Sequence, residues 1–121
     1  MSKHNRAQRL MPLGIPKYIR CYDNGGTEVE GGTIDRYTVV YTGRYRRDDE
    51  QFMYVGMSER PTHPQGFCQH GFSDYQIDSP DGRRPPAIGK KNHLGTRIKF
   101  GDLPDACREV VMLEYLEIWR I

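Results

Sequence analysis

The sequence predicts an α+β domain: a small antiparallel β-sheet of three to five strands, one C-terminal helix packed across it, and a long ordered loop. Three observations support this fold class. Residues 34–43 are β-branched and aromatic and show strand alternation. Residues 58–95 carry prolines and glycines that exclude long regular elements. Residues 102–119 combine a helix-start signal with a broad apolar stripe.

The size and composition fit one cytoplasmic domain. The chain has 121 residues, which is near the commonest domain size. Its three cysteines form no C-x-x-C pair, which favours a reducing compartment. No apolar run approaches the ~20 residues of a membrane span, and no secretory leader opens the chain. We expect residues 1–16 to form a flexible N-terminal arm and residues 17–121 to form the domain.

The strands are expected in the first half of the domain. Residues 17–22 (KYIRCY) alternate like a strand and are followed by the turn signal DNGG. TEVEGG is either a short edge strand or part of the loop. Residues 34–43 have apolar side chains on both faces and should be a central strand. Residues 44–51 form a charged hairpin tip, and residues 52–57 return as the next strand of a meander.

The second half of the domain begins with residues 58–95, which we expect to form a long ordered loop over one sheet edge. Long connections in compact domains are uncommon and tend to be functional. Residues 96–100 (TRIKF) follow as a short strand. In the C-terminal helix, Asp102 is the expected N-cap and Pro104 lies in the first turn. Glu114 lies within the apolar stripe and needs a partner, for which the candidates are Arg20, Arg36 and Arg97.

A second apolar patch on this helix suggests a homodimer. Met112, Leu116 and Trp119 lie together on the side away from the main stripe. Such a patch on a small domain is typical of a contact between two copies. The alternative is that the long loop covers it.

The charge is segregated although the net charge is only +2. Residues 1–20 contain five lysines and arginines and no acid, and residues 83–99 contain six and no acid. Such asymmetry favours an anionic, nucleic-acid or acidic protein partner, although a solvated surface has the same composition.

Two glycine-containing segments are the best candidates for a ligand site, namely HPQGFCQHG (63–71) and GKKNHLG (89–95), the second of which is flanked by glycines. Their lysines could neutralise phosphates or acidic side chains, their amides could orient a ligand, and Phe67 could stack on a base. A second basic patch mixes an aromatic ring with arginines on the hairpin tip. The ligand-binding candidates are Gln65, Phe67, Gln69, His70, Lys90, Lys91, Asn92 and His93, and the second patch is Arg44, Tyr45, Arg46 and Arg47.

Some of the same residues are candidates for a metal site or for catalysis. His63, Cys68, His70 and His93 could supply four zinc ligands, but H-x4-C-x-H matches no standard zinc pattern, so we expect no metal and no cofactor. The histidines His63, His70 and His93 could alternatively serve a small nuclease or phosphodiesterase. No established catalytic motif is present, so a non-enzymatic protein is favoured.

The ordered series YTVVYTG, YVGMS, HPQGF-QHG, HLG and RIKF-DLP resembles a group of small proteins encoded by bacteriophages and other mobile elements. The resemblance covers residues 17–119 and departs from the group at Cys68, where a glycine is expected. It implies a protein of the bacterial host cytoplasm and carries over no catalytic residue. By analogy with small phage domains, we expect an inhibitor of a host defence component (anti-CRISPR-like), or a protein that sequesters a nucleotide or nucleic acid. Its partner would be a host protein or that nucleotide or nucleic acid, with no membrane involved.

Overall fold

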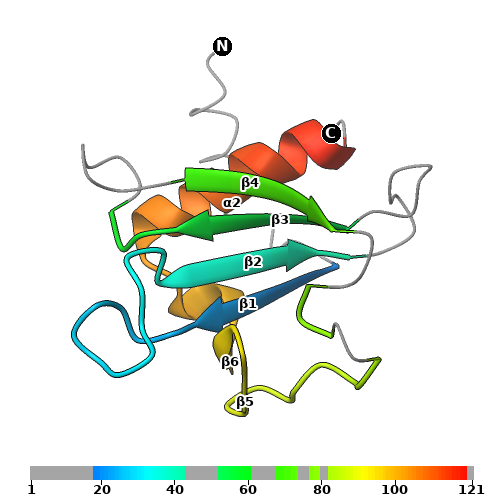
Figure 1. The fold of residues 1–121 in the computed structure, drawn as a ribbon. Helices are drawn as coiled ribbons and strands as arrows, with labels where there is room; N and C mark the ends of the chain where they lie inside the picture. Colours follow the sequence, from blue (N-terminus) through cyan, green and yellow to red (C-terminus); the bar gives the residue numbers. More distant parts are fainter. Residues whose placement is uncertain (1–17, 43–51, 61–67, 74–76, 80–81, 120–121) are drawn as a thin grey trace.

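The structure is a computed structural model that describes residues 18–42, 52–60, 68–73, 77–79 and 82–119, with residues 52, 68–73 and 115–119 described by their backbone alone. It consists of one antiparallel sheet and a C-terminal helix that crosses one face of the sheet (Figure 1), so the predicted fold class is confirmed. The elements in chain order are β1 (Ile19–Asp23), β2 (Tyr37–Tyr41), β3 (Phe52–Met57), β4 (Cys68–Ser73), β5 (Lys91–Asn92), β6 (Gly95–Ile98), the 3₁₀ helix η2 (Phe100–Asp102) and α2 (Asp105–Trp119).

The sheet has the strand order β4-β3-β2-β1-β6-β5 in the described part of the chain. The first three strands form the predicted meander and β4 extends it, with each strand antiparallel to the one before it. The chain then passes from β4 at one edge to the β5–β6 hairpin at the other edge, where β6 pairs with β1. Five described strands have four residues or more and β5 has two, so the described sheet is slightly larger than predicted.

The main core lies between the sheet and α2. Cys21, Val39 and Val55 are paired across three neighbouring strands, so their side chains point to the same face. Cys107 and Val111 of α2 complete this fully buried layer. The apolar stripe predicted for the helix therefore faces the sheet, as expected, in the part of the helix whose side chains are described. Burial raises the pKa of the Cys21 thiol to about 12, which keeps this cysteine protonated and makes it a packing residue.

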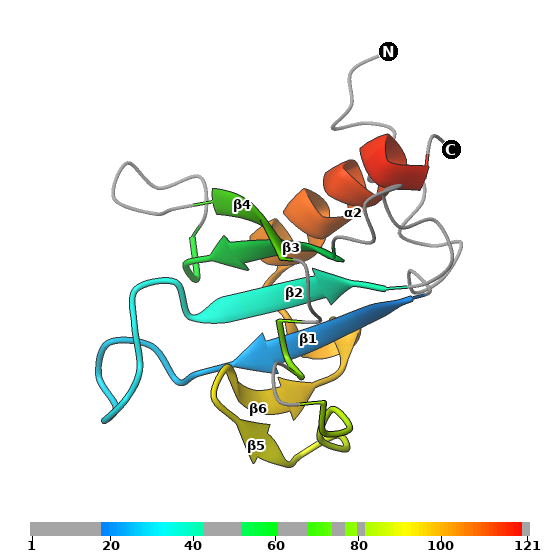
Figure 2. The same cartoon turned by 45° about the vertical axis from the view of Figure 1, so that its right-hand side comes forward.

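The opposite face of the sheet is also covered near β1. Tyr22 and Val40, which alternate with the core residues, are both 0% exposed. Asp78, in the segment that leads from β4 towards β5, lies over this face and bonds to the side chains of Arg20 and Tyr22. Figure 2 shows β1 and β2 near the middle of the sheet with α2 on its far side. The prediction that residues 34–43 form a central strand with two apolar faces is thus confirmed for 37–41.

Two boundaries differ from the sequence prediction, and one open alternative is decided. Residues 68–73, predicted as part of a loop, form β4, because an edge strand is held by backbone bonds to one neighbour and needs no apolar alternation. The helix begins at Asp105, since the side chain of Asp102 instead accepts the backbone N–H of Lys99 and closes η2. TEVEGG belongs to the loop between β1 and β2. The N-terminal arm lies outside the described residues.

Met112 belongs to the core. It is 3% exposed and packs in the cluster between the sheet and α2. It therefore does not form part of the outward patch that the helical spacing predicted, because the core covers a wider sector of the helix than the main stripe. The side chains of Leu116 and Trp119 lie outside the described ones, so the homodimer stays a prediction.

Candidate functional site

The described parts of the two candidate segments lie at opposite edges of the described sheet. Gln69 and His70 are in β4, whereas Lys91 and Asn92 form β5, and four strands separate β4 from β5. The described backbone therefore does not bring these residues into one site. Among the other candidates, His63, Gln65 and Phe67 lie outside the described residues, as do the four residues of the second basic patch, 44–47.

Asn92 and His93 bond to the backbone of the segment before the hairpin. The Asn92 Nδ2 donates to the carbonyl of Asp78 at 3.0 Å, and its Oδ1 accepts the backbone N–H of Leu94 at 2.9 Å. The His93 Nε2 lies 2.8 Å from the carbonyl oxygen of Ile77. These two side chains fasten residues 77–78 to the hairpin, which is a structural task that no sequence pattern indicated.

Asp78 is the centre of this attachment. Its carboxylate accepts two hydrogen bonds from Arg20: Nε donates to Oδ2, and Nη2 donates to Oδ1 at 3.0 Å. The Tyr22 hydroxyl donates a third hydrogen bond to Oδ2 at 2.7 Å. Burial disfavours the charged carboxylate, but the bonds from Arg20 and Tyr22 outweigh it and hold its pKa below the usual value. Burial and the bond to Asp78 both raise the pKa of the Tyr22 hydroxyl. The carboxylate accepts three hydrogen bonds from two side chains, which assigns it to the attachment of this segment.

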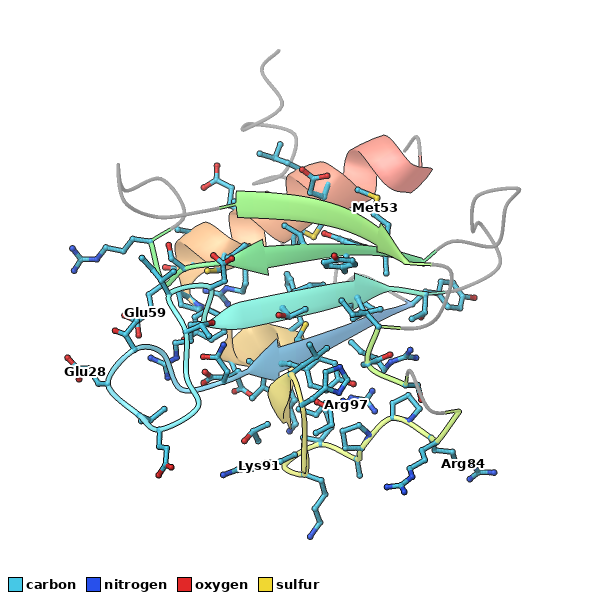
Figure 3. The ribbon with its side chains drawn as sticks, in the orientation of Figure 1. Glu28, Met53, Glu59, Arg84, Lys91 and Arg97 are labelled. Atoms are coloured by element: carbon cyan, nitrogen blue, oxygen red, sulfur yellow. The ribbon has the colours of Figure 1, made fainter. Side chains whose placement is uncertain are left out.

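A basic surface surrounds the β5–β6 hairpin. Between Gly82 and Gly101 the chain has six lysines and arginines and no acid, and it folds into one end of the molecule (Figures 1 and 3). Arg97 is half-buried, and its Nη1 donates to the Pro86 carbonyl at 2.9 Å. The other five cations are exposed, and we call them the basic hairpin surface: Arg83, Arg84, Lys90, Lys91 and Lys99.

Lys91 and Arg84 extend away from the ribbon in Figure 3. Within the part of the chain that the structure describes, Arg84, Lys90 and Lys91 make no ion pair. Lys90 and Lys91 are predicted by their glycine-flanked segment. The arginines at 83 and 84 were missed as site residues, although the count of charges along the sequence already contained them.

The loop between β1 and β2 forms a second, acidic region. Arg36 donates to both carboxylate oxygens of Asp23, at 2.7 and 3.1 Å, and its Nη1 donates to Glu59. These bonds raise the pKa of the Arg36 guanidinium. The guanidinium also lies 5.2 Å from the centre of the Tyr37 ring. Figure 3 shows Glu28 and Glu59 on this side, away from Lys91 and Arg84.

A pocket of about 360 Å³ opens beside Arg36. Its walls are the start and end of the loop and the residues that follow β3: Gly25, Gly26, Thr27, Glu28, Thr33, Ile34, Arg36, Ser58, Glu59 and Arg60. The loop can close on itself only because Gly32 has no side chain, since a Cβ there would collide with the carbonyl of Gly26. The sequence predicts a turn at DNGG and an edge strand or a loop at TEVEGG, and it does not indicate a pocket.

Neither a metal site nor a membrane-spanning helix is observed among the described residues. No three histidine, cysteine or acidic side chains there gather as metal ligands would, and Cys68 and His70 lie at the other edge of the sheet from His93. No described helix is long and apolar enough to cross a membrane.

Comparison with known proteins gives no relative from which a role could be transferred. No protein-family model, no curated protein and no solved structure matches this chain.

Proposed function

We propose that this chain is a non-enzymatic binding protein whose basic hairpin surface holds a nucleic acid. The observation that carries the proposal is the concentration of five exposed cations, with no acid between Gly82 and Gly101, on one short hairpin and the residues directly before and after it. Phosphates are recognised by such cation clusters, and the resulting affinity is electrostatic and depends steeply on salt.

The shape of this region supports binding better than catalysis. Lys90 and Lys91 are exposed at the start of a hairpin whose turn is fixed by Asn92 and His93, so the cations are presented on an ordered element. The ring of His93, a candidate base for a nuclease, lies against a backbone carbonyl. This contact favours an anchoring task for His93 rather than proton transfer to a substrate.

The motif series of residues 17–119 leads us to propose further that the protein acts in the cytoplasm of a bacterium that carries a phage or mobile element. There, capture of a nucleic acid would interfere with a host defence system that depends on it. The alternative is direct inhibition of a host protein, bound through an acidic face of that partner.

The test is fluorescence anisotropy with a labelled single-stranded oligonucleotide and the full chain, repeated over a range of salt concentrations. The double variant Lys90→Glu/Lys91→Glu should weaken binding at least tenfold and reduce the salt slope by about 0.7 for each phosphate that the chain no longer neutralises. Arg60→Glu is the matched control, because Arg60 is exposed but follows β3, three positions from β6 in the sheet.

Equal affinities for the double variant, the control and the unaltered chain would overturn the proposal. Loss of intact oligonucleotide during the titration, abolished by His70→Ala, would instead establish a histidine-dependent nuclease. Absence of oligonucleotide binding, together with capture of an acidic host protein that depends on Lys90 and Lys91, would establish the protein inhibitor.

A further inference from the structure

The pocket beside Arg36, taken together with the ion pairs that support it, has one more negative than positive charge. Glu28 is exposed and has no ion-pair partner among the residues that the structure describes. The charge of Arg36 is already compensated, since it binds Asp23 and Glu59 together. With Arg60 at the wall, the pocket and its supporting ion pairs contain three carboxylates and two guanidinium groups.

A buried hydroxyl without a partner marks the same pocket. Ser58 lines it and is only 7% exposed, and its Oγ bonds to no group in the described structure. The backbone carbonyl of Ser58 is occupied by the Cys107 thiol at 3.2 Å, so the residue itself is held in place from the helix side. An unsatisfied buried hydroxyl is unfavourable, and a ligand group that donates to it would remove this cost.

An apolar wall completes the site. The side chain of Ile34 lines the pocket, although it is 45% exposed in the absence of a ligand. The sequence predicts it as part of a strand, but the strand begins three residues later and leaves it on the loop. An exposed isoleucine beside carboxylates suits a ligand that joins a cationic head to a short hydrocarbon chain.

We propose that this pocket binds an alkyl ammonium or alkyl guanidinium group. The cation would lie between the carboxylates of Glu28 and Glu59, its chain would contact Ile34, and the Ser58 hydroxyl would act as an additional acceptor. Such a group occurs in free polyamines and in lysine or arginine side chains of peptides. The site does not depend on the basic hairpin surface, and a basic group bound here carries the charge opposite to that of a nucleic acid.

The experiment is a two-dimensional ¹H–¹⁵N NMR titration of the full chain with agmatine, spermidine and a short arginine-containing peptide. Agmatine should shift the amide signals of Gly25, Gly26 and Thr33 in a saturable way. Glutamate, which carries the wrong net charge, should not. Tighter binding of the free amines would identify a polyamine site, and tighter binding of the peptide would identify a side-chain site.

The variants use two acids of one loop. Glu28→Gln should weaken agmatine binding by about five- to tenfold, because it removes a charged hydrogen-bond acceptor without breaking an ion pair of the described structure. Glu30→Gln is the matched control, since Glu30 is exposed on the same loop but does not line the pocket, and it should change the affinity by less than about twofold.

Ser58→Ala should weaken binding by a smaller factor and leave the fold intact, because its hydroxyl bonds to nothing in the described structure. Absence of saturable shifts with any of the three cations would overturn the proposal. An equal loss in Glu28→Gln and Glu30→Gln would also overturn it, because that result would show general attraction to an acidic loop.

Discussion

Strand β1 anchors two irregular segments with the same kind of ion pair, but the two pairs differ in exposure. Arg20 binds Asp78 of the segment before the hairpin, and the side chains are 14% and 0% exposed. Asp23 binds Arg36 of the acidic loop, and the side chains are 22% and 28% exposed. The first pair is shielded by the sheet and by Tyr22, whereas the second borders an open pocket.

This difference separates a structural attachment from an adaptable one. A buried charge whose partner is removed stays uncompensated, so the Arg20–Asp78 pair fixes residues 77–79 over the sheet. A half-exposed pair can exchange its partner for water or for a ligand at small cost. The acidic loop is therefore the region where binding can rearrange contacts. The basic hairpin surface is instead attached to the sheet through the buried Arg20–Asp78 pair.

The largest expected effect comes from breaking the buried pair. Asp78→Ala should lower the free energy of unfolding by about 3–5 kcal/mol, because it leaves Arg20 buried without its carboxylate. Asp23→Ala, the matched change at the other pair, should cost about 1 kcal/mol. Urea denaturation of both variants measures the contrast. A loss for Asp78→Ala no larger than that for Asp23→Ala would remove the distinction between the two attachments.

The next effect concerns the point where the hairpin meets β1. Gly95 has φ +115°, and a Cβ there would collide with the carbonyl of Asp23. Gly95→Ala should therefore cost about 2–3 kcal/mol through backbone strain and displacement of β6. Gly101→Ala is the control, since a Cβ at that glycine has no neighbour within 4 Å. Thermal unfolding of the two variants should differ clearly, and equal melting temperatures would refute the predicted close approach.

The smallest effect is a difference in acid sensitivity. The pKa of Asp78 is lowered in the folded state, so its contribution is present above about pH 4 and is lost as the pH falls through the folded pKa. Asp78→Asn should therefore be destabilising at neutral pH, with a deficit that narrows in acid. Burial raises the pKa of Asp35, whose Oδ1 has no partner among the described residues, so its ionisation opposes folding at neutral pH.

Asp35→Asn should accordingly be neutral or slightly stabilising near pH 7, and this benefit should disappear as the pH falls below about 4. Unfolding free energies of the two asparagine variants, measured across the acid range, test the opposite signs. Parallel pH profiles for both variants would show that the two carboxyls have similar environments.

The regular elements could be predicted because their side chains carry the pattern. The alternation around Val39 and the helical stripe through Cys107 and Val111 each identify a face that must be buried. β4 could not be found in this way, because an edge strand is defined by backbone pairing with β3 and contains glycine and polar residues. The position of the long segment depends on Asp78, a single acid in a stretch without periodicity.

The candidate sites show the same limit. The charge count located the basic hairpin surface, since the run from Gly82 to Gly101 is short enough to fold into one place. The pocket could not be predicted from the sequence, because Glu28 and the pair Ser58 and Glu59 come from segments that are far apart in the chain. The three arginines considered as partners for Glu114 have other partners in the described structure. Arg20 binds Asp78, Arg36 binds Asp23 and Glu59, and Arg97 binds a carbonyl.

The most direct test of the division between the two regions is an NMR titration of the full chain with a short single-stranded oligonucleotide. The amide signals of Lys90, Lys91 and Arg84 should shift saturably at low salt, and those of Gly25, Gly26 and Thr33 should stay within the noise. Raising the salt concentration should reverse the shifts. Shifts confined to the acidic loop or to β4, with the hairpin signals unchanged, would contradict the assignment of the basic hairpin surface as the nucleic-acid site.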